Sequence, residues 1–359
     1  MVNTMKIRFL FPVLLFAIIL GITACSDEKG GIADDIIVDN AAILTGQDVL
    51  LDDFKAYNQK MLEQFDIDFR VVTTANDEDI DLFANRVFSS MQKKSRSTSG
   101  KAILLVLNSA QDLLRLEVSM ALEPVYTDGF VSYLERKGLV PYFRANKVAD
   151  AVFVASELIR DRAFEAAEGQ EFMESMVSRS IGAGAKTAAN TGVFNPDDKA
   201  GDMVQLSEGT GPEAVLDSYL TVLQTHNKNP DLEIYSKASR EFFRKWTVTD
   251  INQGNEYRFI TQCKEERKAI YSDDGQYAVL LAPISKRTCC PYFFRQEEGK
   301  WRLDIATMAK IIRFNMDMEY HFSMKDKKES AKMYDFAFQG LRYDKNGFPF
   351  RQAAAQSSE

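Results

Sequence analysis

The sequence predicts two folded regions of mixed type: an N-terminal α/β sandwich, then a cone-shaped α+β domain with an antiparallel sheet. In the first region, helical periodicity alternates with short strands rich in β-branched residues. In the second region, helices come first, and short strands separated by turns follow them. A length of 359 residues fits two domains, because single cores stop growing at roughly 250–300 residues.

The first 24 residues have the organisation of a secretory leader. Lys6 and Arg8 precede an apolar run at residues 9–20, which is too short for a bilayer that needs about 20 residues. The following GITAC, residues 21–25, resembles the lipobox of bacterial lipoproteins. That resemblance implies removal of residues 1–24, acylation of Cys25, and a lipid anchor in the bacterial cell envelope, on the periplasmic face or at the outer membrane. An ordinary secretory leader with an incidental cysteine is the alternative.

The chain after the leader begins with a predicted polar tether over residues 25–35, and the first domain is expected over residues 36–167. The apolar strand KAILLVL, residues 101–107, is expected to be buried on both faces. The patterns predict helices over residues 46–65, 79–93, 130–139 and 148–167, and strands over residues 68–74, 101–107 and 113–120.

Residues 168–210 are expected to form an exposed linker, because they are rich in small residues and poor in large apolar ones. The turn Asn195-Pro196-Asp197-Asp198 supports this interpretation. A glycine-rich phosphate loop around Gly182 and Gly184 is disfavoured, because no strand precedes these glycines and the spaced third glycine and lysine are missing.

The second domain is expected over residues 211–345, followed by a polar tail over residues 346–359. Asp273-Asp274-Gly275 and Glu297-Glu298-Gly299 are predicted hairpin turns. The patterns predict helices over residues 213–223 and 232–243, strands over residues 257–261, 266–272, 277–283, 291–296 and 300–305, and a charged helical region over residues 308–339.

Composition excludes some classes of function. The net charge of −8 argues against sequence-independent binding of nucleic acid, which needs a basic surface. His226 and His321 are the only histidines and lie far apart in the sequence, so a His-rich zinc site or a His-based nucleophilic triad has little support.

Three cysteines follow Cys25. Because Cys289 and Cys290 are adjacent and pair with each other only through a strained ring, Cys263 is the better partner for one of them in an oxidising compartment, with Cys263–Cys289 as the candidate bond. Three buried free thiols are an equally good interpretation.

Five segments of the first region form a recognisable pattern. They are IVDNAAILT (37–45), KAILLVL (101–107), QDLLRLEV (111–118), ALEPVYTD (121–128) and VPYFRANKVADAV (140–152). Together these segments resemble the TPM domain, an extracytoplasmic module of thylakoid, chloroplast-associated and bacterial envelope proteins. The resemblance covers about residues 36–167 and implies phosphatase activity, calcium binding, or a role in the assembly or repair of membrane complexes.

The sequence also departs from the TPM pattern. Thr98-Ser99-Gly100 replaces an acidic-Asn-Gly turn, and Ser119, Met120 and Ala121 replace glycines. Because glycine permits close backbone approach and positive φ, its loss predicts a crowded or closed cleft and weakens the catalytic interpretation first.

The second half faintly resembles the nuclear-transport-factor-like or SnoaL-like superfamily, through its opening helix and GKWRLD at residues 299–304. This resemblance implies a cone-shaped fold with a concave apolar pocket. The aromatic residues of this half are expected to belong mostly to a core, with binding of a small ligand as the weaker alternative.

Four carboxylates at positions that match the TPM pattern form a candidate site for Ca²⁺ or Mg²⁺, since hard cations prefer oxygen ligands. They are Asp39, Asp112, Glu123 and Asp128. The alternative is structural, with Asp128 as a helix N-cap and Glu123 solvated. No residue is assigned as catalytic, because no coherent nucleophile and base are present.

The sequence therefore favours a lipid-anchored, extracytoplasmic accessory protein that presents two domains to a protein partner. We expect it to assist the assembly or maintenance of a membrane complex, and the sequence favours a role without catalysis. The alternative is a divalent-metal-dependent phosphatase of the cell envelope.

Overall fold

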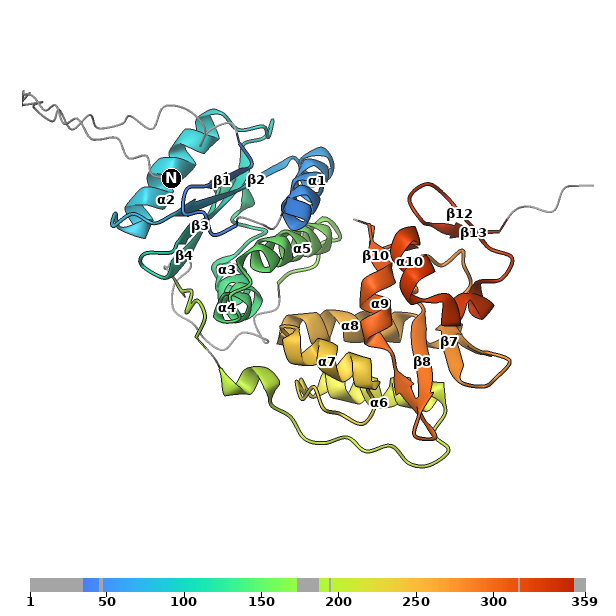
Figure 1. Ribbon diagram of the computed structural model, residues 1–359. Coiled ribbons are helices and arrows are strands. Elements are labelled where there is room, and N and C mark those ends of the chain that lie inside the picture. The colour runs from blue at the N-terminus through green and yellow to red at the C-terminus, as the bar shows by residue number, and fades with distance from the viewer. Residues whose placement is uncertain (1–34, 45–47, 173–186, 194, 316, 352–359) are drawn as a thin grey trace, which may run out of the picture. The chain divides into compact units, whose positions relative to one another are not determined.

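The computed structural model describes residues 35–44, 48–172, 187–193, 195–315 and 317–351. A five-stranded sheet organises the first half of the chain (Figure 1). Its strands are β1 (Ile37–Asp39), β2 (Ile67–Thr74), β3 (Lys101–Asn108), β4 (Leu113–Val118) and β5 (Thr187–Ala188), in that spatial order. Strands β1, β2 and β3 are parallel to one another, whereas β4 runs antiparallel to both β3 and β5.

Both faces of this sheet are covered by helices. On β3, Ile103 and Leu105 pack with the first core cluster, which includes residues of α1 (Asp48–Phe65) and α5 (Val148–Ala167). Leu104 and Val106 of the same strand pack instead with α2 (Ile80–Lys93). Because successive side chains of a strand point to opposite faces, a continuous apolar run is needed here. The prediction that this strand is buried on both faces is confirmed.

Short helical elements connect β4 to α5. They are the 3₁₀ turn η1 (Met120–Leu122), α3 (Asp128–Tyr133), the π-helical segment η2 (Leu134–Leu139) and α4 (Val140–Arg144). The sequence predicted one helix over residues 130–139, and the structure divides this region into helical segments of different types.

The second half contains a separate core around an antiparallel meander. The strands lie in the order β6 (Lys268–Tyr271), β7 (Tyr277–Leu281), β8 (Tyr292–Glu297) and β9 (Lys300–Leu303). Gly275 and Gly299 have φ of 67° and 72°, a left-handed conformation that glycine accepts readily. The two predicted hairpin turns are therefore confirmed.

Helices and small two-stranded sheets complete the second half. The helices are α6 (Pro212–Gln224), α7 (Lys237–Lys245), α8 (Asp250–Gln262), α9 (Ile305–Ile311) and α10 (Met324–Ser330), with 3₁₀ segments η4 (Pro196–Lys199), η5 (Lys264–Glu266) and η6 (Lys332–Phe338). The small sheets pair β10 (Ile312–Phe314) with β11 (Tyr320–Phe322), and β12 (Arg342–Tyr343) with β13 (Pro349–Phe350). Among the described helices, none is both long and apolar enough to cross a bilayer.

The prediction of a strand over residues 257–261 is wrong, because these residues belong to α8. The hydroxyl of Thr249 accepts a hydrogen bond from the backbone N–H of Asn252 and caps the helix. Ile251 and Ile260 of this helix are buried. The aromatic and β-branched residues that suggested a strand are thus accommodated by tertiary packing, which overrides their weak local preference.

Two other predictions need correction. The helix expected over residues 232–243 begins only at Lys237, after the cap residue Ser236, and the buried Leu232 and Ile234 precede it in non-helical backbone. The helical region expected over residues 308–339 is interrupted by the β10–β11 hairpin. There Asn315 Oδ1 accepts hydrogen bonds from the N–H groups of Asp317 and Glu319, and such Asn side chains stabilise turns.

The segment expected to be an exposed linker, residues 168–210, contributes to the sheet of the first half and to the core of the second half. Thr187 and Ala188 pair with Leu114 and Leu113 as β5, and Leu206 packs into the second core. In the expected polar tail, β13 pairs with β12.

Candidate functional site

The four candidate carboxylates lie at the two opposite ends of the strands in the five-stranded sheet. Asp39 is the last residue of β1, and Asp112 directly precedes β4, so both lie at the carboxyl ends of the parallel strands. Glu123 and Asp128 follow the far end of β4. Since β4 has six residues, the two ends are roughly 20 Å apart at 3.4 Å per residue. The structure therefore does not bring all four side chains into one group.

Asp39 stabilises the turn that follows β1. Its carboxylate accepts hydrogen bonds from the N–H groups of Ile43 and Leu44, at 3.1 and 3.0 Å, and from the hydroxyl of Thr73 at 2.5 Å. The Thr73 oxygen in turn accepts from the N–H of Ala41 at 3.0 Å. This network accounts for the carboxylate without a cation.

Asp112 fixes the loop that follows β5. It has a φ of 52°, a left-handed conformation that Asp adopts more readily than most residues. Its carbonyl accepts from the N–H of Ala189 at 2.8 Å, and its Oδ1 accepts from the N–H of Thr191 at 2.9 Å. Its main observed contacts are therefore structural.

Glu123 and Asp128 are both exposed. The expectation that Asp128 caps α3 is wrong, because the hydroxyl of Thr127 accepts from the N–H of Phe130, while Asp128 is the first residue of the helix. An acidic side chain in a first helical turn is favourable to the helix dipole. Asp128 thus has a structural role at the start of α3.

The residues that replace the expected glycines form an ordinary turn. Ser119 has a φ of −68°, and its hydroxyl accepts from the N–H of Ala102 at 3.0 Å. Met120 is 82% exposed, so its side chain points into solvent rather than into a cleft. The expected closure of a cleft by these larger side chains is not seen at Met120.

A buried ion-pair network at the start of β2 escaped the sequence analysis. Asp68, which is fully buried, accepts from Arg70 Nη2 at 2.8 Å and from Arg96 Nε at 3.0 Å. Burial opposes ionisation of Asp68, but the arginine hydrogen bonds hold its pKa below the ordinary value. Charged residues two positions apart in a strand lie on the same face, so the spacing of Asp68 and Arg70 could have predicted their ion pair.

Glu135 is a second functional candidate that sequence analysis missed. It lies in η2 and is 3% exposed. Its Oε1 accepts from the N–H of Leu116 in β4 at 3.2 Å, and its Oε2 accepts from the hydroxyl of Thr187 in β5 at 2.6 Å. Burial raises the pKa of Glu135 to about 7, despite these hydrogen bonds. The segment LERKG gave no sign of burial.

A pocket of about 380 Å³ lies at the edge where the parallel strands end. Asn108 at the end of β3 and Ser109 after it line the pocket, together with Val148 and Ala149 from the start of α5 and Thr191. Ligands of open α/β sheets commonly bind outside the carboxyl ends of parallel strands. This position makes the pocket a candidate binding site of the first half.

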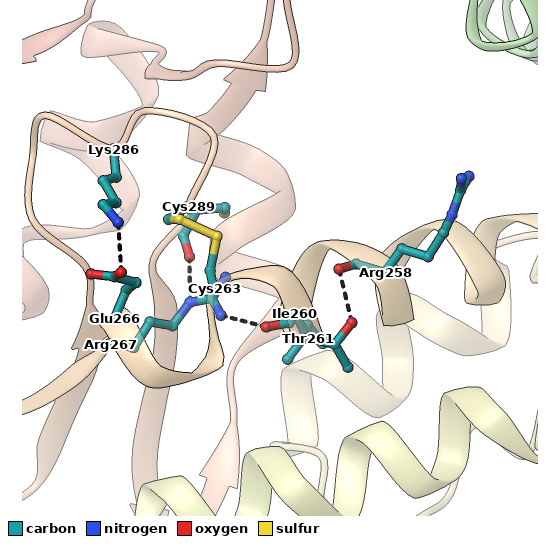
Figure 2. The surroundings of a disulfide bond; sticks show 9 residues. Arg258, Ile260, Thr261, Cys263, Glu266, Arg267, Lys286 and Cys289 are labelled. Carbon is teal, nitrogen blue, oxygen red and sulfur yellow. Dashed lines mark hydrogen bonds and ion pairs between the residues drawn. A yellow bond between two sulfur atoms is a disulfide. The ribbon is translucent and has the colours of Figure 1, made fainter. Parts of the chain in front are cut away.

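The structure joins Cys263 and Cys289 by a disulfide, with sulfur atoms 2.07 Å apart (Figure 2). Arg267 braces the same region, since its Nε donates to the carbonyl of Cys290 and its Nη1 donates to that of Ile260. Cys290 is a buried free thiol, and burial raises its pKa. The proposed lipid-bearing Cys25 lies outside the described residues.

The arrangement of the first half agrees with a comparison to known families. Residues 37–162 match the family model of the TPM domain. A solution NMR structure of the N-terminal domain of a protein from P. gingivalis is similar to 39% of this chain and 88% of its own, with 18% identity and a TM-score of 0.33. Among curated proteins, none matches the chain. The match to the TPM domain thus spans β1–β4 and most of α5, whereas β5 lies beyond it.

Proposed function

We propose that this protein is a lipid-anchored extracytoplasmic accessory protein that assists the assembly or maintenance of a membrane complex. The lipobox-like segment ending at Cys25 supports the anchor. The disulfide between Cys263 and Cys289 supports a location outside the cytosol, because disulfides persist mainly in oxidising compartments.

The observation that carries the accessory role is the separation of the candidate carboxylates. Asp39 and Asp112 bind backbone N–H groups at one edge of the TPM domain, and Glu123 and Asp128 are exposed near the other. A cation site needs several oxygen ligands converging on one point. The structural duties of these side chains favour binding to a partner over metal-dependent catalysis.

In-cell crosslinking followed by membrane fractionation tests this function. The wild-type protein is expected in the membrane fraction and crosslinked to a defined membrane-complex subunit. Cys25→Ser removes the acylated thiol and is expected to lose both results, whereas Cys290→Ser keeps the anchor and serves as the control. Equal membrane retention of wild type and Cys25→Ser would contradict the anchor, and absence of any specific crosslink would contradict the partner role.

A divalent-metal-dependent phosphatase is the second candidate, and the pocket beside the first turn of α5 favours it. Helix N-termini attract phosphate groups, because their first N–H groups lack partners within the helix. Phosphate release from p-nitrophenyl phosphate that requires Mg²⁺ or Ca²⁺ would support this function. Loss of that activity in Asp112→Asn or in Asp128→Asn would show which end of the sheet holds the site. No phosphate release above the metal-free control would exclude the phosphatase function.

A further inference from the structure

A largely apolar cavity that the accessory function does not use lies mainly among elements of the second half of the chain. Helices α6, α7, α8 and α9 and strands β8 and β10 contribute to it, and Glu157, Arg160 and Asp161 of α5 add charged groups to the lining. The lining residues that matter here are Tyr219, Phe243, Gln253, Glu256, Tyr292 and Met308. Concave apolar surfaces with a few convergent polar groups are typical of small-molecule sites.

Gln253 is the unusual member of this lining. Its side chain is 4% exposed, and its Nε2 donates to the carbonyl of Asn227 at 2.8 Å. The carbonyl of Asn227 requires a donor, so the amide orientation is fixed. The opposite atom, Oε1, is buried and accepts no hydrogen bond from any described residue. A buried acceptor without a donor is unfavourable, and it commonly marks a site for water or a ligand.

Glu256 lies one helical turn further along α8 and adds a second acceptor. Its Oε1 accepts from the hydroxyl of Tyr292 at 2.5 Å, and Tyr292 is 1% exposed. Arg267 lies over the Tyr292 ring, with its guanidinium carbon 4.9 Å from the ring centroid. Residues three apart on a helix share a face, so Gln253 and Glu256 both lie on the side of α8 that lines the cavity.

We propose that this cavity binds a small apolar molecule carrying one N–H or O–H donor, which fills the vacant acceptor position at Gln253 Oε1. The aromatic and aliphatic lining holds the apolar body, and the amide oxygen selects for the donor. Amines and alcohols share this chemistry.

A matched set of probes tests the donor requirement on the full mature chain. 2-Phenylethylamine, 2-phenylethanol and ethylbenzene have the same apolar body and carry an ammonium group, a hydroxyl group or no donor. Dissociation constants come from ligand-observed NMR titration. At least one donor probe is expected to bind about tenfold more tightly than ethylbenzene, as one added hydrogen bond permits. The stronger of the two identifies the donor class.

Gln253→Leu removes the acceptor at similar side-chain length and is expected to abolish the preference for donor probes. Gln262→Leu, on the exposed surface of the same helix, is the matched control and is expected to leave the preference unchanged. A small space of about 30 Å³ beside Gln253 can hold a water molecule. If water already occupies the acceptor, the wild-type protein will bind all three probes equally. Equal binding, or no binding of any probe, overturns the proposal even if Gln253→Leu fails to fold.

Discussion

The carboxylate of Asp39 shows how a residue at a family-motif position can hold the local backbone. Three donors surround it at the end of β1, namely the N–H groups of Ile43 and Leu44 and the hydroxyl of Thr73. Asp112 similarly holds the backbone after β5. Sequence analysis could not tell a carboxylate that accepts amide hydrogen bonds from one that binds a cation.

Asp39→Ala is expected to lower the free energy of unfolding by about 2 kcal/mol, because buried donors lose their acceptor. The destabilisation is expected to be the same with Ca²⁺ and with EDTA. Urea denaturation under both conditions measures it, with the exposed Glu123→Ala as a control expected within about 0.5 kcal/mol of wild type. A loss that appears only with Ca²⁺ would instead assign Asp39 to a metal site.

Glu135 makes stability depend on pH. Burial raises its pKa from an ordinary value of 4.5 to about 7 in the folded protein, so the folded state binds more protons between these pH values. The free energy of unfolding therefore falls as pH rises through this window. Relative to Glu135→Gln, wild type is expected to lose up to about 3 kcal/mol between pH 5 and pH 8.

Urea denaturation of both proteins at several pH values measures this difference, since other titrating groups contribute equally to each. Glu135→Gln keeps an oxygen for the N–H of Leu116. A difference that stays constant from pH 5 to pH 8 would show that Glu135 does not titrate there.

At the scale of elements, long amphipathic segments could be predicted and short pairings could not. The helix predicted over residues 148–167 has the same bounds as α5, and the strand predicted at 101–107 is β3 within one residue. In contrast, β5 has two residues, and its place depends on Leu113 and Leu114 of β4, which lie more than 70 residues earlier. A pattern confined to so few residues carries no periodicity to detect.

The sequence predicted a strand over residues 257–261, which belong to α8. The N-terminal cap of this helix can be tested for its contribution to stability. Thr249→Ala removes the hydroxyl that accepts from the N–H of Asn252, and it is expected to cost about 1 kcal/mol. Thr261→Ala, at an exposed position near the other end of the helix, is the matched control. Thermal unfolding followed by circular dichroism compares them, and equal stability of the two variants would argue against a capping role.

At the scale of the whole molecule, the disulfide contributes to the stability of the second half. The bond closes a loop between positions 26 residues apart, from the end of α8 to the loop before β8. Such a loop restricts the unfolded chain, and its loss is expected to cost about 3 kcal/mol.

Denaturation with and without dithiothreitol measures this contribution. Wild type is expected to become less stable on reduction, whereas a Cys263→Ala/Cys289→Ala variant is expected to be insensitive. An unchanged denaturation midpoint for fully reduced wild type would show that the bond adds no stability.

The position of β5 determines where a fragment of the first half should end. Residues 37–162 carry the family match, yet the outer edge of β4 is paired by Thr187 and Ala188, well beyond it. A fragment ending with the match would leave backbone groups of Leu113 and Leu114 open to a strand from another molecule. Self-association of such a fragment would therefore reflect its missing edge strand, and a fragment that keeps the β4–β5 pairing and the Thr191–Asp112 hydrogen bond must extend at least to residue 191.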